Sequence, residues 1–289
     1  MLGVLFSNLF LVVGILASKA ALHSLSPVCF LSIRMLLASS VVLSYLIFVS
    51  KSRFRVSWIE FQKILFMVFF TSLLPLILKT TALRSVDSAR YAFWGSLDPF
   101  VAAFWSFVFW REALSLRQVL AVLMCCFSVF LAFSNINAVS FFYYDLLMVA
   151  SVFLGKLGWV LCFNFLKNTS LSVIQINSLV SFLTGVGAFG IMFLGGEFSC
   201  EVFQSRPGAG FFLSALASFS YLLGYFFFTN GLRSNNFVLV SMIGSSIPLL
   251  VGVVEFVCFN KSIDQYLFFS IVINAFSVFL FSIYSGKCK

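Results

Sequence analysis

Residues 80–133 read TTALRSVDSARYAFWGSLDPFVAAFWSFVFWREALSLRQVLAVLMCCFSVFLAF, and the same pattern returns later in the chain. Shifted by one constant offset, the stretch matches residues 229–280 at fourteen positions, which include Gly95 on Gly244 and Pro99 on Pro248. The register has no gap and ends with five consecutive identities, 127–131 on 276–280. Because an internal repeat determines how a whole chain is organised, the fold is predicted outward from this one.

The composition indicates a membrane protein. Of the 289 residues 62% are hydrophobic and only 9% are charged, which is too little polar surface for a soluble domain of this length. Apolar runs of about 18 or more residues, long enough to cross a bilayer, recur from one end to the other. The fold class predicted is an all-α polytopic membrane protein.

Counting apolar runs between charges and turn residues gives ten predicted transmembrane helices. The first, beginning near residue 2, is interpreted as a retained span, since no basic residue precedes it as in a signal peptide. The spans are roughly 2–22, 27–49, 62–80, 88–110, 116–134, 142–163, 171–194, 209–230, 236–259 and 264–284.

The formal charge of +9 is explained by Lys and Arg between the apolar runs, and nucleic acid is not predicted as a partner. With the N-terminus inside, ten basic residues fall on the cytoplasmic side and six, Lys79 among them, on the other. We therefore expect a multi-pass protein of the bacterial inner membrane with both termini cytoplasmic. The seven cysteines have no metal-ligand spacing and are interpreted as apolar side chains.

The two copies of the repeat lie five spans apart, and an odd number of crossings inverts the second copy. The predicted units are residues 1–137 and 138–289, each with five helices. Inverted repeats of this kind build secondary carriers that rock about a site near the bilayer midplane. A symmetric channel ranks lower, since no filter-like motif or ring of like charges is visible.

Residues 81–118, followed by an apolar span, resemble the EamA-type half of the drug/metabolite transporter superfamily. In that family an Ala-Leu pair ends span three, a Pro interrupts span four, and a Glu before a Leu-Ser-like turn leads into span five. The counterparts here are Ala82-Leu83, Asp98-Pro99 and residues 112–115. The segment HSLSPVCFLSIRMLLAS, residues 23–39, resembles the family's entry to span two, with Pro27 and Arg34 in the expected places.

The resemblance implies a transporter, with solutes that vary among members and include amino acids, amines, nucleotide-like metabolites and S-adenosylmethionine. The second copy departs from the pattern, since Lys261 replaces the Glu and Ile247 stands where the first copy has Asp98. These departures bear on the substrate more than on the fold.

Four ionisable residues fall inside predicted spans and are the leading candidates for substrate binding: Arg34, Asp98, Lys156 and Glu255. A charge in the bilayer costs about 2.5–3.5 kcal/mol on insertion scales, so each is a functional candidate by default. Arg34 could bind a substrate carboxylate or pair with Asp98. Lys156 and Glu255 lie nearer predicted span ends, where the alternative is that a long side chain reaches water.

Asp98 stands directly before Pro99, which disfavours helix at the preceding residue. Together with Gly95, this pair predicts a broken span four, and Gly244 with Pro248 predicts a matching break in span nine. The alternative reading of Asp98 is a cap on the half-helix after the break. Backbone carbonyls freed at both breaks could line one cavity.

Five rarer aromatic residues lie within spans and are candidates for a substrate-facing wall, which would suit an organic cation: Tyr91, Trp94, Trp105, Trp159 and Tyr225. Most of the 41 Phe residues are expected to face lipid or pack between helices. Small residues such as Gly155 and Gly158 are interpreted as permitting close helix packing.

Enzyme motifs are absent. His23 is the only histidine, so neither an HExxH nor a His-rich metal site exists, and no phosphate-binding GxxxxGK[ST] loop occurs. No cofactor or metal is predicted.

Asp98 or Glu255 could carry a coupling proton if exchange alone does not drive transport.

The function predicted is an ATP-independent alternating-access carrier of a small charged or zwitterionic metabolite. S-adenosylmethionine exchanged for S-adenosylhomocysteine is the specific hypothesis, and an amino-acid or amine exporter is the first alternative. A lipid flippase and a non-transporting membrane scaffold remain as alternatives of other classes. Besides this metabolite and the lipid bilayer no partner is predicted, and the oligomeric state is left open.

Overall fold

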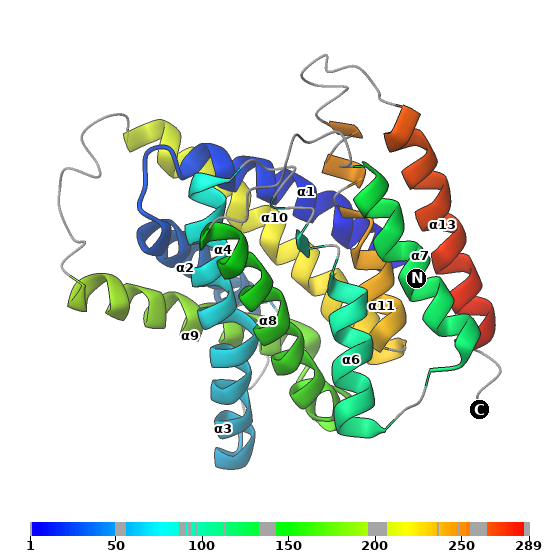
Figure 1. Cartoon of the computed structure of the whole chain (residues 1–289). Coiled ribbons are helices and arrows are strands. Elements are labelled where there is room, and N and C mark those ends of the chain that lie inside the picture. Colours follow the sequence, from blue (N-terminus) through cyan, green and yellow to red (C-terminus); the bar gives the residue numbers. More distant parts are fainter. Residues whose placement is uncertain are drawn as a thin grey trace.

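The computed structural model describes most of the chain as helix (Figure 1). The described residues are 2–49, 56–86, 91, 94–95, 97–111, 114–132, 143–195, 207–235, 237–247, 249–251, 253–254 and 265–285, and no strand occurs among them. The helices are α1 (Leu2–Ala21), α2 (Pro27–Ser44), α3 (Trp58–Met67), α4 (Leu74–Ser85), α6 (Asp98–Trp110), α7 (Leu116–Ala132), α8 (Tyr143–Asn168), α9 (Val173–Leu194), α10 (Pro207–Ser234), α11 (Phe237–Gly244) and α13 (Gln265–Ser285).

Two π-helical turns continue or join these helices. The turn η1 (Tyr45–Val49) prolongs α2, and η2 (Val68–Leu73) joins α3 to α4. As a result the third predicted span is one continuous helical segment, Trp58–Ser85, that is longer at both ends than the sequence indicated.

Six helical segments in the described part of the chain are long and apolar enough to cross a membrane. They are Gly3–Ala21, Pro27–Phe48, Trp58–Ser85, Tyr143–Asn168, Val173–Leu194 and Ala209–Ser234. The all-helical, multi-pass prediction is confirmed, and the structure supports six of the ten predicted spans. The other four correspond to α6, α7, α11 and α13.

Helices from distant parts of the sequence pair with one another (Figure 1). The most extensive contacts join α1 to α10, α2 to α9, α7 to α13, and α4 to α8. Figure 1 shows α7 and α13 side by side on one flank and α1 lying along α10. Each of these pairs joins the first half of the chain to the second, so neither half forms a separate core.

Several helix starts are fixed by local sequence. Ser26 is the N-cap of α2, where its hydroxyl accepts a hydrogen bond from the Cys29 amide at 3.3 Å and Pro27 occupies the first turn. Capping boxes begin α3, through Ser57 and Glu60, and α9, through Ser172 and Gln175. These contacts satisfy amide groups that the first turn of a helix leaves without a partner.

Spans four and nine are both interrupted. In span four α6 begins at Asp98, with Leu97 in the N-cap position and Pro99 in the first turn. In span nine α11 ends at Gly244, and the following turn is closed by tighter bonds between residues three apart, from the Ser245 amide to the Met242 carbonyl at 3.2 Å and from the Ser246 amide to the Ile243 carbonyl at 3.1 Å. The predicted breaks therefore occur, although Pro248 itself lies outside the described residues.

Close packing of α8 on η2 depends on Gly158. A Cβ atom at this position would lie 2.7 Å from the carbonyl carbon and 2.8 Å from the carbonyl oxygen of Phe70, which is closer than backbone atoms permit. Gly158 thus acts as a packing residue, as the sequence indicated.

Gly158→Ala is expected to lower the free energy of unfolding by about 1–3 kcal/mol, since overpacking forces backbone shifts of that cost. Gly190→Ala is the matched control, because a Cβ there would meet no atom within 4 Å. Thermal unfolding of the detergent-purified variants measures the difference, and equal melting temperatures for the two would contradict the packing shown here.

Candidate functional site

A cavity of about 180 Å³ lies where the two interrupted spans meet the long helices. Its walls come from α1, α2, α4, α8, α10 and α11, together with Tyr91, Gly95 and Asp98. The lining includes charged, polar and aromatic side chains: Asn8, Arg34, Lys79, Tyr91, Asp98, Lys156, Trp159, Tyr221, Tyr225 and Phe228.

Both helix breaks contribute to the cavity. Gly95 and Asp98 line it from span four, and Gly244 and Ile247 line it from span nine. Ile247 is the position that the sequence repeat aligns with Asp98, so equivalent residues of the two copies face one space. Pro99 is buried beside the cavity in the first turn of α6.

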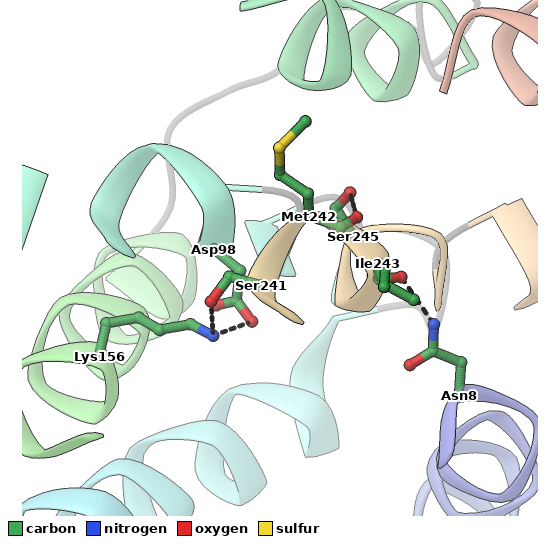
Figure 2. A network of polar contacts seen from close by, with 7 residues as sticks. All are labelled: Asn8, Asp98, Lys156, Ser241, Met242, Ile243 and Ser245. Carbon is green, nitrogen blue, oxygen red and sulfur yellow. Dashed lines mark hydrogen bonds and ion pairs between the residues drawn. The ribbon is translucent and has the colours of Figure 1, made fainter. Parts of the chain in front are cut away.

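Asp98 and Lys156 form an ion pair in this wall (Figure 2). The Lys156 Nζ lies 3.0 Å from Asp98 Oδ2 and donates to the Ser241 hydroxyl at 3.2 Å. The Lys156 side chain is 6% exposed and that of Asp98 is 24% exposed. Phe228 and Phe237 also flank the ammonium group, at 5.7 and 5.9 Å from their ring centroids.

This pair corrects two readings of the sequence. Lys156 does not reach water from a span end, because α8 runs to Asn168 and places Lys156 in its middle. Asp98 is the first residue of α6 and not its N-cap, which is Leu97, and the carboxylate is bound to Lys156.

Arg34 lies on α2 without pairing to Asp98. It is 8% exposed, and its guanidinium donates to the Ser18 hydroxyl only at 3.5 Å. The guanidinium carbon stacks over the Tyr221 ring at 4.7 Å and over Phe30 at 5.8 Å. Its buried Nε has no hydrogen-bond partner in the described part of the chain, so this donor is unsatisfied in the present arrangement.

An aromatic wall closes one side of the cavity. Trp159 on α8 packs 5.8 Å from Tyr225 and 5.4 Å from Phe228 on α10, measured between ring centroids. Tyr225 in turn lies 4.2 Å from Tyr221. Of the five aromatic residues singled out in the sequence, Trp159, Tyr225 and Tyr91 line the cavity.

Trp94 and Trp105 are directed elsewhere. The indole of Trp94 donates to Asp145 Oδ1 at 2.6 Å, and that of Trp105 donates to the Phe153 carbonyl at 3.0 Å. Neither residue is among those lining the cavity. Asp145 itself is fully buried near the start of α8. Glu255, the remaining candidate from the sequence, lies outside the described residues.

Three cavity residues were missed by sequence reasoning. Lys79, near the end of predicted span 62–80, was counted only among the basic residues of the non-cytoplasmic side, but it lies inside α4 and lines the cavity. Tyr221 is fully buried beneath Arg34 and was one aromatic among many. Asn8 on α1 donates to the Ile243 carbonyl at 2.7 Å (Figure 2). It also donates to the Ser246 hydroxyl at 2.9 Å, and these bonds tie α1 to the break in span nine.

Metal binding has no support among the residues that the structure describes. Within those ranges, no group of three or more His, Cys, Asp or Glu side chains is placed to hold a metal ion. The polar chemistry of the cavity is that of an ion pair, a buried guanidinium and a second lysine.

Comparisons with known proteins point to transport. Two relatives, from Chlamydia muridarum (strain MoPn / Nigg) and Chlamydia trachomatis serovar D, are both called S-adenosylmethionine/S-adenosylhomocysteine transporters. The first is 27% identical over 88% of this chain and 82% of its own length, and the second is 26% identical over 88% and 80%.

A solved crystal structure shares the fold, with a TM-score of 0.76, 12% identity, and coverage of 99% of this chain and 97% of the other. Residues 1–134 match the EamA-like transporter family. This match, with the names of the relatives, indicates a transporter rather than an enzyme, and it confirms the family resemblance that the sequence indicates.

Proposed function

We propose that this chain is a secondary, ATP-independent carrier that moves a small charged or zwitterionic metabolite across the bacterial inner membrane by alternating access. The observation that carries the proposal is the cavity at the two helix breaks, which combines the Asp98–Lys156 ion pair, the buried Arg34 and an aromatic wall. Interrupted helices around a central polar site are typical of secondary transporters.

We also propose the architecture of two inverted five-helix repeats, residues 1–137 and 138–289. Under this scheme α1, α2, α4, α6 and α7 correspond to α8, α9, α10, α11 and α13. The observed pairs support this proposal, because under the proposed correspondence the pair α1 with α10 becomes the observed pair α8 with α4. The pairs α2 with α9, α6 with α11, and α7 with α13 each map onto themselves.

Exchange of S-adenosylmethionine for S-adenosylhomocysteine is the specific substrate hypothesis. The names of the chlamydial relatives support it. The chemistry of the cavity is compatible, since Trp159, Tyr225 and Tyr91 could stack against a purine ring and Arg34 could hold an amino-acid carboxylate. An amino-acid exporter is the alternative that the same groups favour.

The size of the cavity implies movement. About 180 Å³ is below the roughly 300–1,000 Å³ of ligand pockets, so a nucleoside-sized substrate requires the halves to open further. The contacts between the halves are spread over paired helices, which can rock against one another as alternating access requires.

Counterflow in proteoliposomes tests the proposal. Vesicles loaded with unlabelled S-adenosylhomocysteine are expected to accumulate labelled S-adenosylmethionine, and empty vesicles or protein-free vesicles are not. Vesicles loaded with single amino acids test the alternative. Counterflow with amino acids alone would reject the substrate hypothesis, and movement of labelled lipid without any soluble counterflow would reject the carrier in favour of a flippase.

A further inference from the structure

The charges that line the cavity do not balance. Among the described lining residues the cations are Arg34, Lys79 and Lys156, and the anion is Asp98. Lys156 and Asp98 compensate one another at 3.0 Å (Figure 2). Arg34 and Lys79 have no carboxylate at ion-pair distance in the described part of the chain, and three cations against one anion give the described lining a net charge of +2.

Lys79 is directed into the cavity by the periodicity of α4. The residues of this helix that line the cavity include Leu76, Lys79, Thr80 and Leu83, which follow the spacing of one helical face. Arg34 enters the same cavity from α2, which packs against α4. Two neighbouring helices thus present one cation each to a shared space.

The surroundings of Arg34 leave its charge partly unsatisfied. Tyr221 and Phe30 offer the faces of their rings, and Ser18 accepts one long hydrogen bond. The buried Nε has no partner among the residues that the structure describes, and a buried donor that lacks an acceptor costs free energy. A planar anion such as a carboxylate could satisfy Nε and a terminal nitrogen together, which is the geometry that guanidinium groups favour.

We propose that Arg34 and Lys79 form a two-cation subsite that binds the carboxylate of the substrate and makes the carrier prefer ligands of zero or negative net charge over cations. This inference rests on the proposed function, because it assigns a part of the same cavity to one group of the substrate. The Asp98–Lys156 pair leaves no free anion in the described lining to favour a cation. Within the proposed exchange, the zwitterion S-adenosylhomocysteine is therefore expected to bind more tightly than the net-positive S-adenosylmethionine.

Paired ligands that differ in one carboxylate test the subsite. The full-length carrier in detergent is titrated with S-adenosylhomocysteine and with its decarboxylated analogue, which keeps the adenosyl thioether and the ammonium group. We expect the wild type to prefer the carboxylated ligand by about tenfold or more, since one charge-assisted hydrogen bond corresponds to about that factor. Equal affinity of the wild type for both ligands would overturn the subsite.

Variants assign the preference to named residues. Lys79→Met is expected to reduce it by about tenfold, and Lys79→Arg to retain most of it because the charge stays in place. Lys167→Met is the matched control, since Lys167 is an exposed lysine on α8 whose Nζ lies over the Phe163 ring at 4.3 Å, outside the cavity. A preference unchanged in Lys79→Met, with the variant folded by size-exclusion chromatography, would also overturn the subsite.

A second ligand pair separates this inference from the substrate hypothesis. Phenylalanine and phenethylamine differ by the same carboxylate and carry no nucleoside. If no adenosyl ligand binds but phenylalanine stabilises the carrier against heat in a Lys79-dependent manner, the substrate hypothesis fails and the subsite stands. If adenosyl ligands exchange without regard to their carboxylate, the carrier stands and the subsite fails.

Discussion

Asp98→Asn and Lys156→Met are each expected to abolish counterflow and to lower the free energy of unfolding. Removal of one member of a buried ion pair typically costs about 3–5 kcal/mol, because the remaining charge is left without compensation. The effect is expected to be larger for Asp98→Asn, since the Lys156 ammonium that remains is 6% exposed and no longer has an anion beside it. Thermal unfolding in detergent and counterflow in proteoliposomes measure the two losses separately.

The double variant Asp98→Asn/Lys156→Met decides what the ion pair does. Replacing both members removes the uncompensated charge, so stability is expected to return toward that of the wild type. Counterflow is expected to remain lost if the pair contacts the substrate or gates the cavity. Recovery of counterflow together with stability would show that the pair only holds α6 against α8, and the site assignment would be wrong. Ser241→Ala serves as a mild control, since it removes one hydrogen bond and no charge.

The helix breaks were predictable from sequence because their causes are local. Pro99 cannot donate a backbone hydrogen bond, and it restricts the conformation of Asp98 before it. The repeat then extended the prediction to Gly244, which ends α11. Arg34 and Asp98 were identified for a similar reason, since an ionisable residue in an apolar run is conspicuous without any structure.

The partners of these charges could not be predicted in the same way. Lys156 contacts Asp98 because α6 packs on α8 with one particular rotation about its axis. The rotation of a helix relative to its neighbour cannot be predicted from a single sequence. The sequence places Lys79 one residue before the end of predicted span 62–80, where it was counted with the basic residues outside the membrane. In the structure α4 continues to Ser85, so Lys79 lies within the helix and lines the cavity.

The aromatic residues illustrate a further limit. Trp94 and Trp105 lie within predicted spans, as Trp159 does, and nothing in the sequence distinguishes the three. In the structure the indole of Trp94 donates to Asp145 and that of Trp105 donates to the backbone of α8. A tryptophan within a span can face a cavity, a neighbouring helix or lipid, and only packing decides among these. The sequence therefore predicts that tryptophan and tyrosine side chains line the cavity, but not which of them do so.

Arg34→Lys is expected to reduce counterflow by about 100-fold although it preserves the charge. A lysine ammonium is a point charge that lacks the planar face stacked on Tyr221 at 4.7 Å. It also lacks the Nε donor, which in Arg34 has no partner within the described ranges. Loss of a buried hydrogen-bonded contact to an anion costs about 2–5 kcal/mol, which is enough for a loss of about 100-fold in counterflow. Initial rates of counterflow, with carrier amounts matched by immunoblot, measure the effect.

Arg84→Lys is the matched control, since Arg84 is exposed at the end of α4 and does not line the cavity. It is expected to exchange at the wild-type rate. Wild-type counterflow in Arg34→Lys would mean that any positive charge suffices at this position, and the planar contact with a carboxylate would be ruled out. A loss confined to ligands that carry a carboxylate, with phenethylamine binding unchanged, would instead locate the role of Arg34 in that contact, because a general defect in folding or opening would affect every ligand alike.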